Sequence, residues 1–193
     1  MNESEKAAAG LLYNANHDVE LLKQRSEAKD KLFDFNSMRP NQTAARSSLI
    51  KGLLGRIGEG FTIEGPFSCD YGFNIEIGEN FYANTNLVIL DGAKVTIGDN
   101  VFIAPNVGLY TAGHPVDVPR RNEGLEYAFP IHIGNNVWIG AGVSVLPGVT
   151  IGDNTVVGAG SVVTRSLPSN VVAAGNPCKV LREITDADAQ KFV

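Results

Sequence analysis

Aliphatic residues recur at every sixth position from Ile57 onward, and this period is the dominant pattern of the chain. The phrase Ile-Gly, followed by an acidic residue or asparagine, occurs five times, and the count of six restarts at each copy. The sixth-position residues are Ile57, Ile63, Cys69, Ile77, Ala83, Ile89, Ile97, Ile103, Leu109, Ile133, Ile139, Val145, Ile151, Val157 and Val163. Thirteen of these 15 residues are Ile, Leu or Val, whereas random placement would give about four. A period of six fits neither an α-helix nor a continuous strand, so it predicts short strands separated by corners.

Three hexads make one triangular coil of 18 residues, and stacked coils pair as parallel strands. The Ile-Gly phrases are spaced by 20, 20, 36 and 18 residues, so the 20-residue coils carry a two-residue insertion at a corner. By strand alternation, the residue four places after each aliphatic position also points inward. This second inward set is Phe61, Phe67, Phe73, Phe81, Leu87, Val101, Val107, Val137, Val143, Thr155 and Ser161. Gly, Asn and Asp favour the corners, because they adopt left-handed backbone angles at low cost.

The first 56 residues lack this period and predict a helical segment, which carries 9 of the 16 Lys and Arg residues. Apolar residues recur there at helical spacing, namely Leu11, Leu12, Val19, Leu21 and Leu22. Asp18 is placed to cap the helix that begins at Val19. Pro40-Asn41 breaks the helical pattern, and residues 44–54 form a second amphipathic stretch that ends at Gly55.

One gap between the Ile-Gly phrases is too long for a single coil. It leaves a polar, irregular insertion over residues 111–130. A long loop in an otherwise rigid solenoid is more often functional than not. We therefore divide the chain into a helical segment (1–56), a solenoid with this insertion (57–180) and a short C-terminal helical tail (181–193).

Composition restricts the class of protein. The 193 residues are 44% hydrophobic and 19% charged, which is typical of a globular domain. No apolar run reaches the roughly 18 residues that a membrane helix needs, and the segment MNESEKAAAG does not read as a signal peptide. The net charge of −5 argues against nucleic-acid binding. Cys69 and Cys178 form neither a disulfide framework nor a zinc motif, so we expect a cytoplasmic protein.

Three segments together carry a family resemblance. They are NFYANTNLVILDGAKVTIGDNVFIAPNVGLYTAGHP (80–115), PIHIGNNVWIGAGVSVLPGVTIGDNTVVGAGSVVTRSLPSNVVAAGNPCKVLREI (130–184) and LYNANHDVEL near the N-terminus. With them the chain resembles the hexapeptide-repeat acyltransferases, and within these the maltose and galactoside O-acetyltransferases. The resemblance implies an all-β-dominated fold, a left-handed parallel β-helix, assembled as a homotrimer with active sites between subunits. It also implies acetyl-CoA as co-substrate, a sugar hydroxyl as acceptor and no metal.

Such a reaction needs a base for the hydroxyl proton, and the chain has three histidines. His17 lies in the helical segment, and His132 alternates with buried-type isoleucines, so it points outward from a strand. His114 begins the insertion and matches the base of the family's GHP motif; an imidazole can accept and return a proton near neutral pH. By resemblance, Glu126 orients this histidine, although a solvated loop acid is the simpler alternative.

The resemblance also supplies residues that face the acceptor. Asn84 and Asp70 match acceptor positions, and Asn84 is additionally placed to stabilise the transition state. Asp91 is a further candidate, although an aspartate at a corner has a structural explanation as well. Residues 14–18, which include Asp18, resemble an N-terminal piece that reaches the acceptor in the family, with helix capping as the alternative role of Asp18.

For acetyl-CoA, the resemblance points to the C-terminal coils. Ala141 matches a backbone N–H directed at the thioester oxygen, and Ala159 and Thr164 match pantetheine contacts. Trp138 either covers the same groove or simply packs. A basic cluster near the end of the chain suits the phosphates of coenzyme A, namely Arg165, Lys179 and Arg182.

Three rival interpretations remain at this stage. A γ-class carbonic anhydrase shares the fold but holds zinc with histidines on adjacent coils, a spacing that the three histidines here do not offer. A non-enzymatic scaffold would need neither the insertion nor the basic cluster. The most serious rival keeps acetyl transfer and changes the acceptor, as in xenobiotic or serine acetyltransferases.

Overall fold

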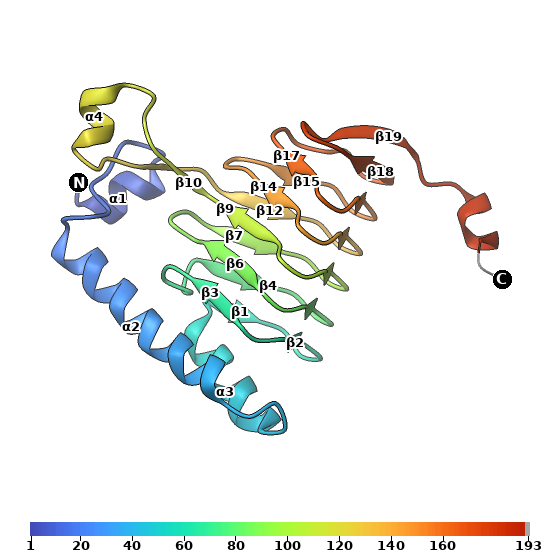
Figure 1. Cartoon of the computed structure of the whole chain (residues 1–193), viewed down its shortest axis with the longest axis horizontal. Coiled ribbons are helices and arrows are strands. Elements are labelled where there is room, and N and C mark those ends of the chain that lie inside the picture. Colours follow the sequence, from blue (N-terminus) through green and yellow to red (C-terminus); the bar gives the residue numbers. More distant parts are fainter. Residues whose placement is uncertain (192–193) are drawn as a thin grey trace.

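The computed structural model describes residues 1–191 as a solenoid of stacked, three-sided coils (Figure 1). Each coil adds a short strand to each of three sheets. Sheet I contains β1 (Arg56–Ile57), β4 (Ile75–Ile77), β7 (Val95–Ile97), β12 (Ile131–Ile133) and β15 (Thr150–Ile151). Sheet II contains β2 (Thr62–Ile63), β5 (Tyr82–Ala83), β8 (Phe102–Ile103), β13 (Trp138–Ile139), β16 (Val156–Val157), β18 (Val171–Ala174) and β19 (Lys179–Glu183). Sheet III contains β3 (Phe67–Cys69), β6 (Leu87–Leu90), β9 (Gly108–Tyr110), β14 (Ser144–Val145) and β17 (Val162–Val163). The prediction of a parallel β-solenoid is confirmed.

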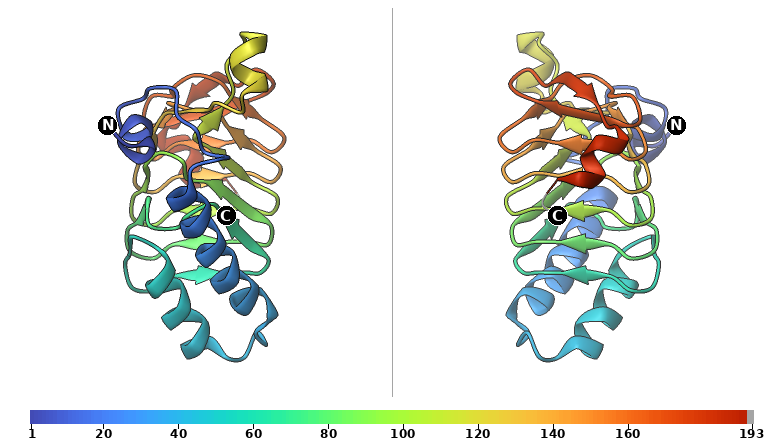
Figure 2. Two further views of the ribbon diagram at one scale, coloured as in Figure 1. Left: turned by 90° about the vertical axis from the view of Figure 1, so that its left-hand side faces the viewer. Right: turned by 90° about the vertical axis from the view of Figure 1, so that its right-hand side faces the viewer.

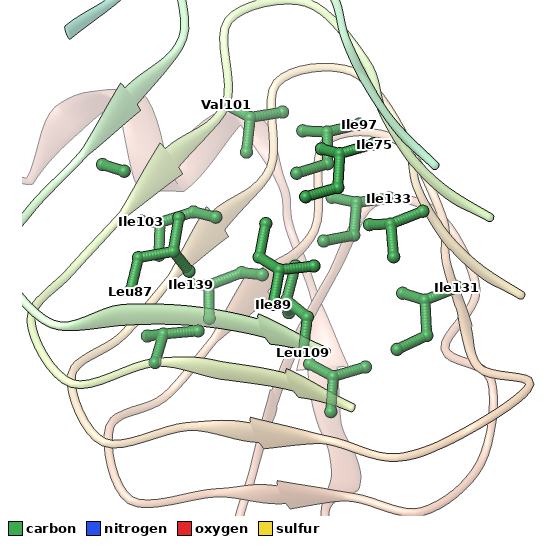
Figure 3. Packing of buried hydrophobic residues seen from close by; sticks show 14 of the residues in the cluster. Ile75, Leu87, Ile89, Ile97, Val101, Ile103, Leu109, Ile131, Ile133 and Ile139 are labelled. Carbon is green, nitrogen blue, oxygen red and sulfur yellow. The ribbon is translucent and has the colours of Figure 1, made fainter. Parts of the chain in front are cut away.

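The sixth-position residues form the core of this solenoid. Strand register aligns Ile77 with Ile97, and Ile97 with Ile133, as parallel partners. The second pairing spans the 36-residue gap, so the coil resumes directly after the insertion. Inward side chains from successive coils pack against one another and are buried, except that Ile57 and Phe61 of the first coil are partly buried (Figure 3). Burial of each such aliphatic side chain contributes about 1.5–3 kcal/mol, which explains why the hexad pattern dominates the sequence.

Asparagines at the corners adopt the expected left-handed conformation. Seven of them have φ between 55° and 62°. Five lie at the corner between sheets I and II, where each side-chain amide donates to the next along the stack, in the order Asn80, Asn100, Asn136, Asn154 and Asn170. This asparagine ladder links successive coils along the stack.

One residue of the second inward set is an exception. Phe73 was expected inside the solenoid but is 47% exposed, so that prediction is wrong. The corner between β3 and β4 carries extra residues, and Gly72 turns the chain there with φ of 82°. Phe73 therefore falls in the corner, outside any strand, where alternation does not apply. Thr155 and Ser161 are buried as predicted, with their hydroxyls donating to backbone carbonyls.

Helices cover the N-terminal end of the stack. The helices are α1 (Glu3–Ala8), α2 (Val19–Ser37) and α3 (Thr43–Leu53), of which α2 and α3 lie against the first coil (Figure 1). Phe35 and Ile50 join the main core. The side chain of Asn36 pairs with both the N–H and the carbonyl of Phe67, so it satisfies the end strand of sheet III. Within residues 1–191, no helix has the length and apolar character to cross a membrane.

The insertion leaves the solenoid between sheets III and I. It contains β10 (Ala112–Gly113), α4 (Val118–Asn122) and β11 (Tyr127–Ala128). Strands β10 and β11 pair in antiparallel fashion, and α4 projects from the body of the molecule (Figure 2). The base of the insertion is thus a fixed hairpin that positions the residues next to it.

The C-terminal segment differs from the expected helix. Residues 179–183 form β19, which runs antiparallel to β18 and is exposed along its length. Helical structure follows only as a 3₁₀ turn, η1 (Asp186–Gln190). A strand forms here because the last parallel strand leaves an open sheet edge, which β19 pairs. Residues 192 and 193 of the expected tail lie outside the described residues.

Candidate active site

His114 lies immediately after β10, at the edge of the solenoid between sheets III and I. Its Nδ1 is 2.9 Å from the carbonyl oxygen of Leu125 on the returning side of the insertion. A carbonyl oxygen can only accept, so Nδ1 carries the hydrogen and Nε2 carries the lone pair in the neutral ring. The imidazole is therefore held in the tautomer that a general base requires, and its side chain is half exposed.

Glu126 belongs to the same hairpin but does not hydrogen-bond to His114. Its Oε1 lies 4.0 Å from His114 Nε2, which is too long for a hydrogen bond. The carboxylate instead accepts from the hydroxyl of Tyr13 at 3.2 Å and from the side-chain amide of Asn16 at 3.2 Å. Tyr13 and Glu126 also exchange two backbone hydrogen bonds. The N-terminal segment therefore fixes the insertion, and the carbonyl of Leu125 orients the histidine.

His114 and Glu126 face a cavity of about 280 Å³. The remaining lining residues are Tyr13, Arg25, Asp70, Tyr71, Leu90, Ala112 and Gly113. Asp70, predicted to face the acceptor, is thus brought beside the predicted base. Burial raises the pKa of Asp70, and the nearby charge of Arg25 counteracts this effect. The guanidinium of Arg25 lies over the Tyr71 ring at 5.6 Å and donates to the Tyr71 hydroxyl at 3.3 Å.

Asp91 does not reach this cavity, which corrects its assignment to the acceptor site. The side chain is fully buried, and its oxygens accept from the backbone N–H groups of Asp70, Tyr71 and Gly72 at 2.7–3.0 Å. Burial raises the pKa of Asp91 to about 6, and these hydrogen bonds oppose the rise. A buried carboxylate with both oxygens occupied holds the corner that carries Asp70 and Tyr71.

Asp18 has the alternative role given above, which is helix capping. Its carboxylate accepts from the N–H of Leu21 at 2.9 Å and so caps α2. Asp18 is not among the residues that line the cavity with His114. A larger cavity of about 620 Å³ lies under α1, but its lining includes neither a histidine nor a carboxylate. The smaller cavity is therefore the candidate active site.

Further predicted residues lie on a different edge of the solenoid, between sheets II and III. This edge contains Asn84, between β5 and β6, together with Ala141 and Ala159 on later coils. The Asn84 side-chain oxygen accepts from Thr85 N–H at 2.8 Å, which leaves its amide NH₂ available. The N–H groups of Ala141 and Ala159 form no hydrogen bond within residues 1–191. This edge thus presents a row of free donors that the chain itself does not bring to His114.

The other residues assigned to acetyl-CoA are also divided among sites. Trp138 lies on the outer face of sheet II and is 55% exposed. Thr164 and Arg165 follow β17 on the edge that carries His114, and both are exposed. Lys179 and Arg182 lie on β19, where Arg182 makes two hydrogen bonds to Asp188 at 2.7 and 2.8 Å. That ion pair lowers the pKa of Asp188.

Sequence reasoning did not single out four residues of the site, although Asn16 lies within the N-terminal piece, residues 14–18, that was expected to reach the acceptor. Tyr13 and Asn16 bind Glu126 across more than a hundred residues, and Arg25 and Tyr71 line the cavity. One sequence signal could have identified Arg25: it lies on the same face of the predicted helix as Leu21 and Ala28, which are apolar. The two histidines outside the site lie apart from it: His17 in the turn before α2, and His132 outward on sheet I beside Thr96. Residues 1–191 contain no cluster of His, Cys, Asp and Glu that could hold a metal.

A parallel solenoid of hexads, interrupted once by a loop that presents a histidine, defines the class of hexapeptide-repeat transferases. Residues 6–58 match the family model described as the maltose acetyltransferase hexapeptide capping motif, and residues 130–165 match the bacterial transferase hexapeptide. The protein YJL218W of Saccharomyces cerevisiae is 62% identical over 98% of this chain and 96% of its own. Galactoside O-acetyltransferase of Escherichia coli is 52% identical over 100% of this chain and 94% of its own. The structure of a galactoside acetyltransferase in complex with coenzyme A has a TM-score of 0.96 and 50% identity, covering 100% of this chain and 96% of that one.

The chain therefore belongs to the hexapeptide-repeat sugar O-acetyltransferase family, and it is an acetyltransferase. The resemblance given by its motifs is confirmed by these comparisons.

Proposed function

We propose that this enzyme transfers the acetyl group of acetyl-CoA to a hydroxyl group of a sugar or glycoside, with His114 as general base. The observation that carries the proposal is the hydrogen bond from His114 Nδ1 to the Leu125 carbonyl, which leaves Nε2 as a proton acceptor in the cavity. Galactoside O-acetyltransferase at 52% identity supports both the donor and the class of acceptor.

The reaction follows from this arrangement. Nε2 takes the proton of the acceptor hydroxyl while its oxygen attacks the thioester carbonyl. The tetrahedral oxyanion accepts hydrogen bonds from the Ala141 N–H and the Asn84 amide; one such donor contributes about 3 kcal/mol to the transition state. The C–S bond then breaks, and the imidazolium returns the proton to the thiolate to give coenzyme A. Glu126, held by Tyr13 and Asn16, provides negative charge near the imidazolium.

Because His114 and the free donors lie on different edges, we infer that the enzyme is a homotrimer. In a ring of three copies, the edge with Asn84 in one subunit meets the edge with His114 in the next, and sheet III faces the common axis. One outward row of sheet III suits this contact, because its residues are small and uncharged: Ser68, Val88, Gly108, Ser144 and Val162. The corresponding row of sheet I is polar or charged: Arg56, Glu76, Thr96, His132 and Thr150.

The same packing would gather the residues that we assign to coenzyme A. Ala141 and Ala159 of one subunit would then border Thr164 and Arg165 of its neighbour along the direction of the stack. Lys179 and Arg182 at its C-terminal end would bind the nucleotide phosphates. Trp138 lies on sheet II beside this groove. We also place the enzyme in the cytoplasm, since Cys69 and Cys178 are both free, buried thiols.

Mixing of inactive subunits tests the shared site. His114→Ala and Asn84→Ala subunits, unfolded together and reassembled in equal amounts, should regain about a quarter of wild-type turnover, because every mixed trimer contains one intact site. His114→Ala mixed with Glu126→Ala is the matched control; both residues lie on one edge, so the mixture should show no more activity than the two variants assembled separately. Absence of recovery in the first mixture, with trimers confirmed by mass measurement, would contradict the shared site.

An acceptor screen tests the substrate class. Acetyl-CoA is supplied with maltose, galactosides, other glycosides, chloramphenicol and serine, and free thiol is measured. Turnover with sugars or glycosides is expected. Turnover only with chloramphenicol or serine would replace the sugar acceptor by the alternative class.

A further inference from the structure

Two fully buried polar side chains lie on the edge of the solenoid that carries His114. Within residues 1–191 the polar or charged side chains without exposed surface are those of Asp91, Thr111, Thr155 and Ser161. Tyr110 is the register partner of Leu90, so Thr111 lies one coil above Asp91 at the same corner. Both side chains bind the backbone of the coil below them, Asp91 through its carboxylate and Thr111 through its hydroxyl.

The Thr111 hydroxyl makes two hydrogen bonds to that coil. It donates to the Leu90 carbonyl at 2.6 Å and accepts from the N–H of Ala93 at 2.9 Å. The Thr111 N–H donates to the same carbonyl at 3.1 Å. A hydroxyl is donor and acceptor at once, so this one side chain pairs two backbone groups of the corner.

Thr111 is also the residue at which the chain leaves the solenoid. Strand β9 ends at Tyr110 and β10 begins at Ala112, so the regular corner after β9 is replaced by the insertion. Ala93 is buried, and without the Thr111 hydroxyl its N–H would be left unpaired. The hydroxyl therefore fastens the root of the insertion to the coil beneath it.

The same residue is joined to the returning side of the insertion and, through it, to the histidine. The Thr111 carbonyl accepts from the N–H of Phe129 at 2.9 Å. Strands β10 and β11 continue this pairing outward, and His114 follows β10 directly, with its Nδ1 bound to the Leu125 carbonyl. Hydrogen bonds thus connect the corner below Thr111 with the imidazole, and a shift of Thr111 would move the strand that carries His114.

We propose that Thr111 is a positioning residue for His114, because its hydroxyl fixes the strand that carries the histidine on the coil below. The proposal rests on the proposed function, in which His114 is the general base. Thr111 is buried and does not line the cavity, so it acts only through the position of the imidazole. Misplacement of a reacting group by about 1 Å can lower the rate by about 100-fold.

Substitutions that remove or keep the hydroxyl provide the test. Thr111→Val keeps the branched shape and removes the hydroxyl, so it should lower kcat by about 10- to 100-fold. The KM for acetyl-CoA should stay within about twofold, because the proposed oxyanion donors lie on another edge. Thr111→Ser keeps the hydroxyl and should retain kcat within about threefold of the wild type. Thr111→Cys has a weakly hydrogen-bonding group and should lose kcat as Thr111→Val does, which preserves the test if the valine variant does not fold.

Thr155→Val is the matched control. Thr155 is equally buried, and its hydroxyl donates to the Pro168 carbonyl at 2.8 Å at the corner between sheets I and II. This substitution should lower the resistance to urea unfolding to a similar degree as Thr111→Val and leave kcat at the wild-type value. Equal losses of kcat in the two valine variants would mean that activity follows stability, which would contradict the proposal.

Failure of this proposal can be told apart from failure of the proposed function. Near-normal turnover in His114→Ala overturns the proposed base together with the role of Thr111. Loss of turnover in His114→Ala with wild-type kcat in Thr111→Val or Thr111→Cys overturns only the role of Thr111. A loss of kcat in Thr111→Ser as large as in these variants also overturns it, because the hydroxyl is then not the group that positions the histidine.

Discussion

His114 donates its Nδ1 hydrogen to the carbonyl oxygen of Leu125, 2.9 Å away across the base of the insertion. A backbone carbonyl is an orienting group that cannot ionise, so the tautomer of the ring does not depend on the protonation of a neighbour. The hairpin of β10 and β11 fixes the separation of these two residues. The geometry of the base is therefore a property of the loop's hydrogen bonding, and Glu126 is left free to act through its charge.

The first prediction concerns this histidine. His114→Ala should lower kcat by about 10²–10⁴, because the proton of the attacking hydroxyl loses its acceptor. Binding of coenzyme A, measured by calorimetry, should be unchanged, since the proposed donor contacts lie elsewhere. His132→Ala is the control, because this residue lies outward on sheet I and should retain wild-type turnover. Near-normal kcat in His114→Ala would remove the proposed base.

The second prediction concerns Glu126. Glu126→Gln should lower kcat by about 10- to 100-fold, because the substitution removes the negative charge that lies beside the imidazolium of His114. The KM for acetyl-CoA should change little. Glu123→Gln is matched for charge and lies exposed in the same insertion, outside this network. Equal effects of the two substitutions would show that Glu126 has no particular role.

The solenoid could be predicted from the sequence because each coil repeats the same packing problem. In every coil the sixth-position side chains must fill the interior. The aliphatic pattern therefore recurs along the whole solenoid and is recognisable even where one position, such as Ala83, departs from it. The burial of Phe73 was predicted wrongly, because extra corner residues interrupt the strand alternation on which the prediction depended. The strand β19 was not predicted either. An antiparallel edge strand follows no hexad pattern, and its five residues are all exposed.

The site was only partly predictable for a related reason. His114 was found because motif and insertion coincide. Tyr13 and Asn16 contact Glu126 outside the hexad repeat, so the periodic pattern does not predict these contacts. Asp91 and Asp70 differ in role only because Asp91 is fully buried. The sequence around an aspartate at a corner is the same whether its carboxylate points into a cavity or accepts hydrogen bonds from backbone N–H groups. That distinction requires the three-dimensional path of the corner.

A third prediction follows from the ion pair on β19. Arg182→Ala should raise the KM for acetyl-CoA by about tenfold, because a charged hydrogen bond to a phosphate is lost. Asp188→Asn should lower this KM, since Arg182 is released from a competing carboxylate. Steady-state kinetics with acetyl-CoA as the varied substrate measures both, with Asp186→Asn as the neutral control in the same turn. An unchanged KM in Arg182→Ala would exclude this residue from the donor site.

A fourth prediction concerns the asparagine ladder. Asn136 has φ of 55°, accepts from Asn100 and donates to Asn154. Asn136→Ala should lower the free energy of unfolding by about 2 kcal/mol, because alanine loses the ladder and is strained at positive φ. Asn136→Gly should cost about 1 kcal/mol, since glycine removes only the hydrogen bonds. Urea unfolding at fixed protein concentration measures both, and equal losses would contradict the contribution of backbone strain.

The last prediction concerns pH and Asp91. Its pKa rises from an ordinary 3.8 to about 6 in the folded protein, chiefly by burial. A raised carboxyl pKa means that the folded state binds this proton more tightly than the unfolded state. The contribution of Asp91 to stability is therefore fully present below about pH 4 and is lost as the pH rises through about 6, by about 3 kcal/mol in total.

Asp91→Asn isolates this effect from the other acids, because asparagine does not titrate. The difference in free energy of unfolding between wild type and Asp91→Asn should change by about 2.4 kcal/mol between pH 4 and pH 7, with the wild type relatively more stable at pH 4. Urea unfolding across this range gives the measurement. A difference that is constant with pH would mean that the three backbone N–H groups of the corner compensate the burial of the charge, and that the Asp91 proton is not linked to folding.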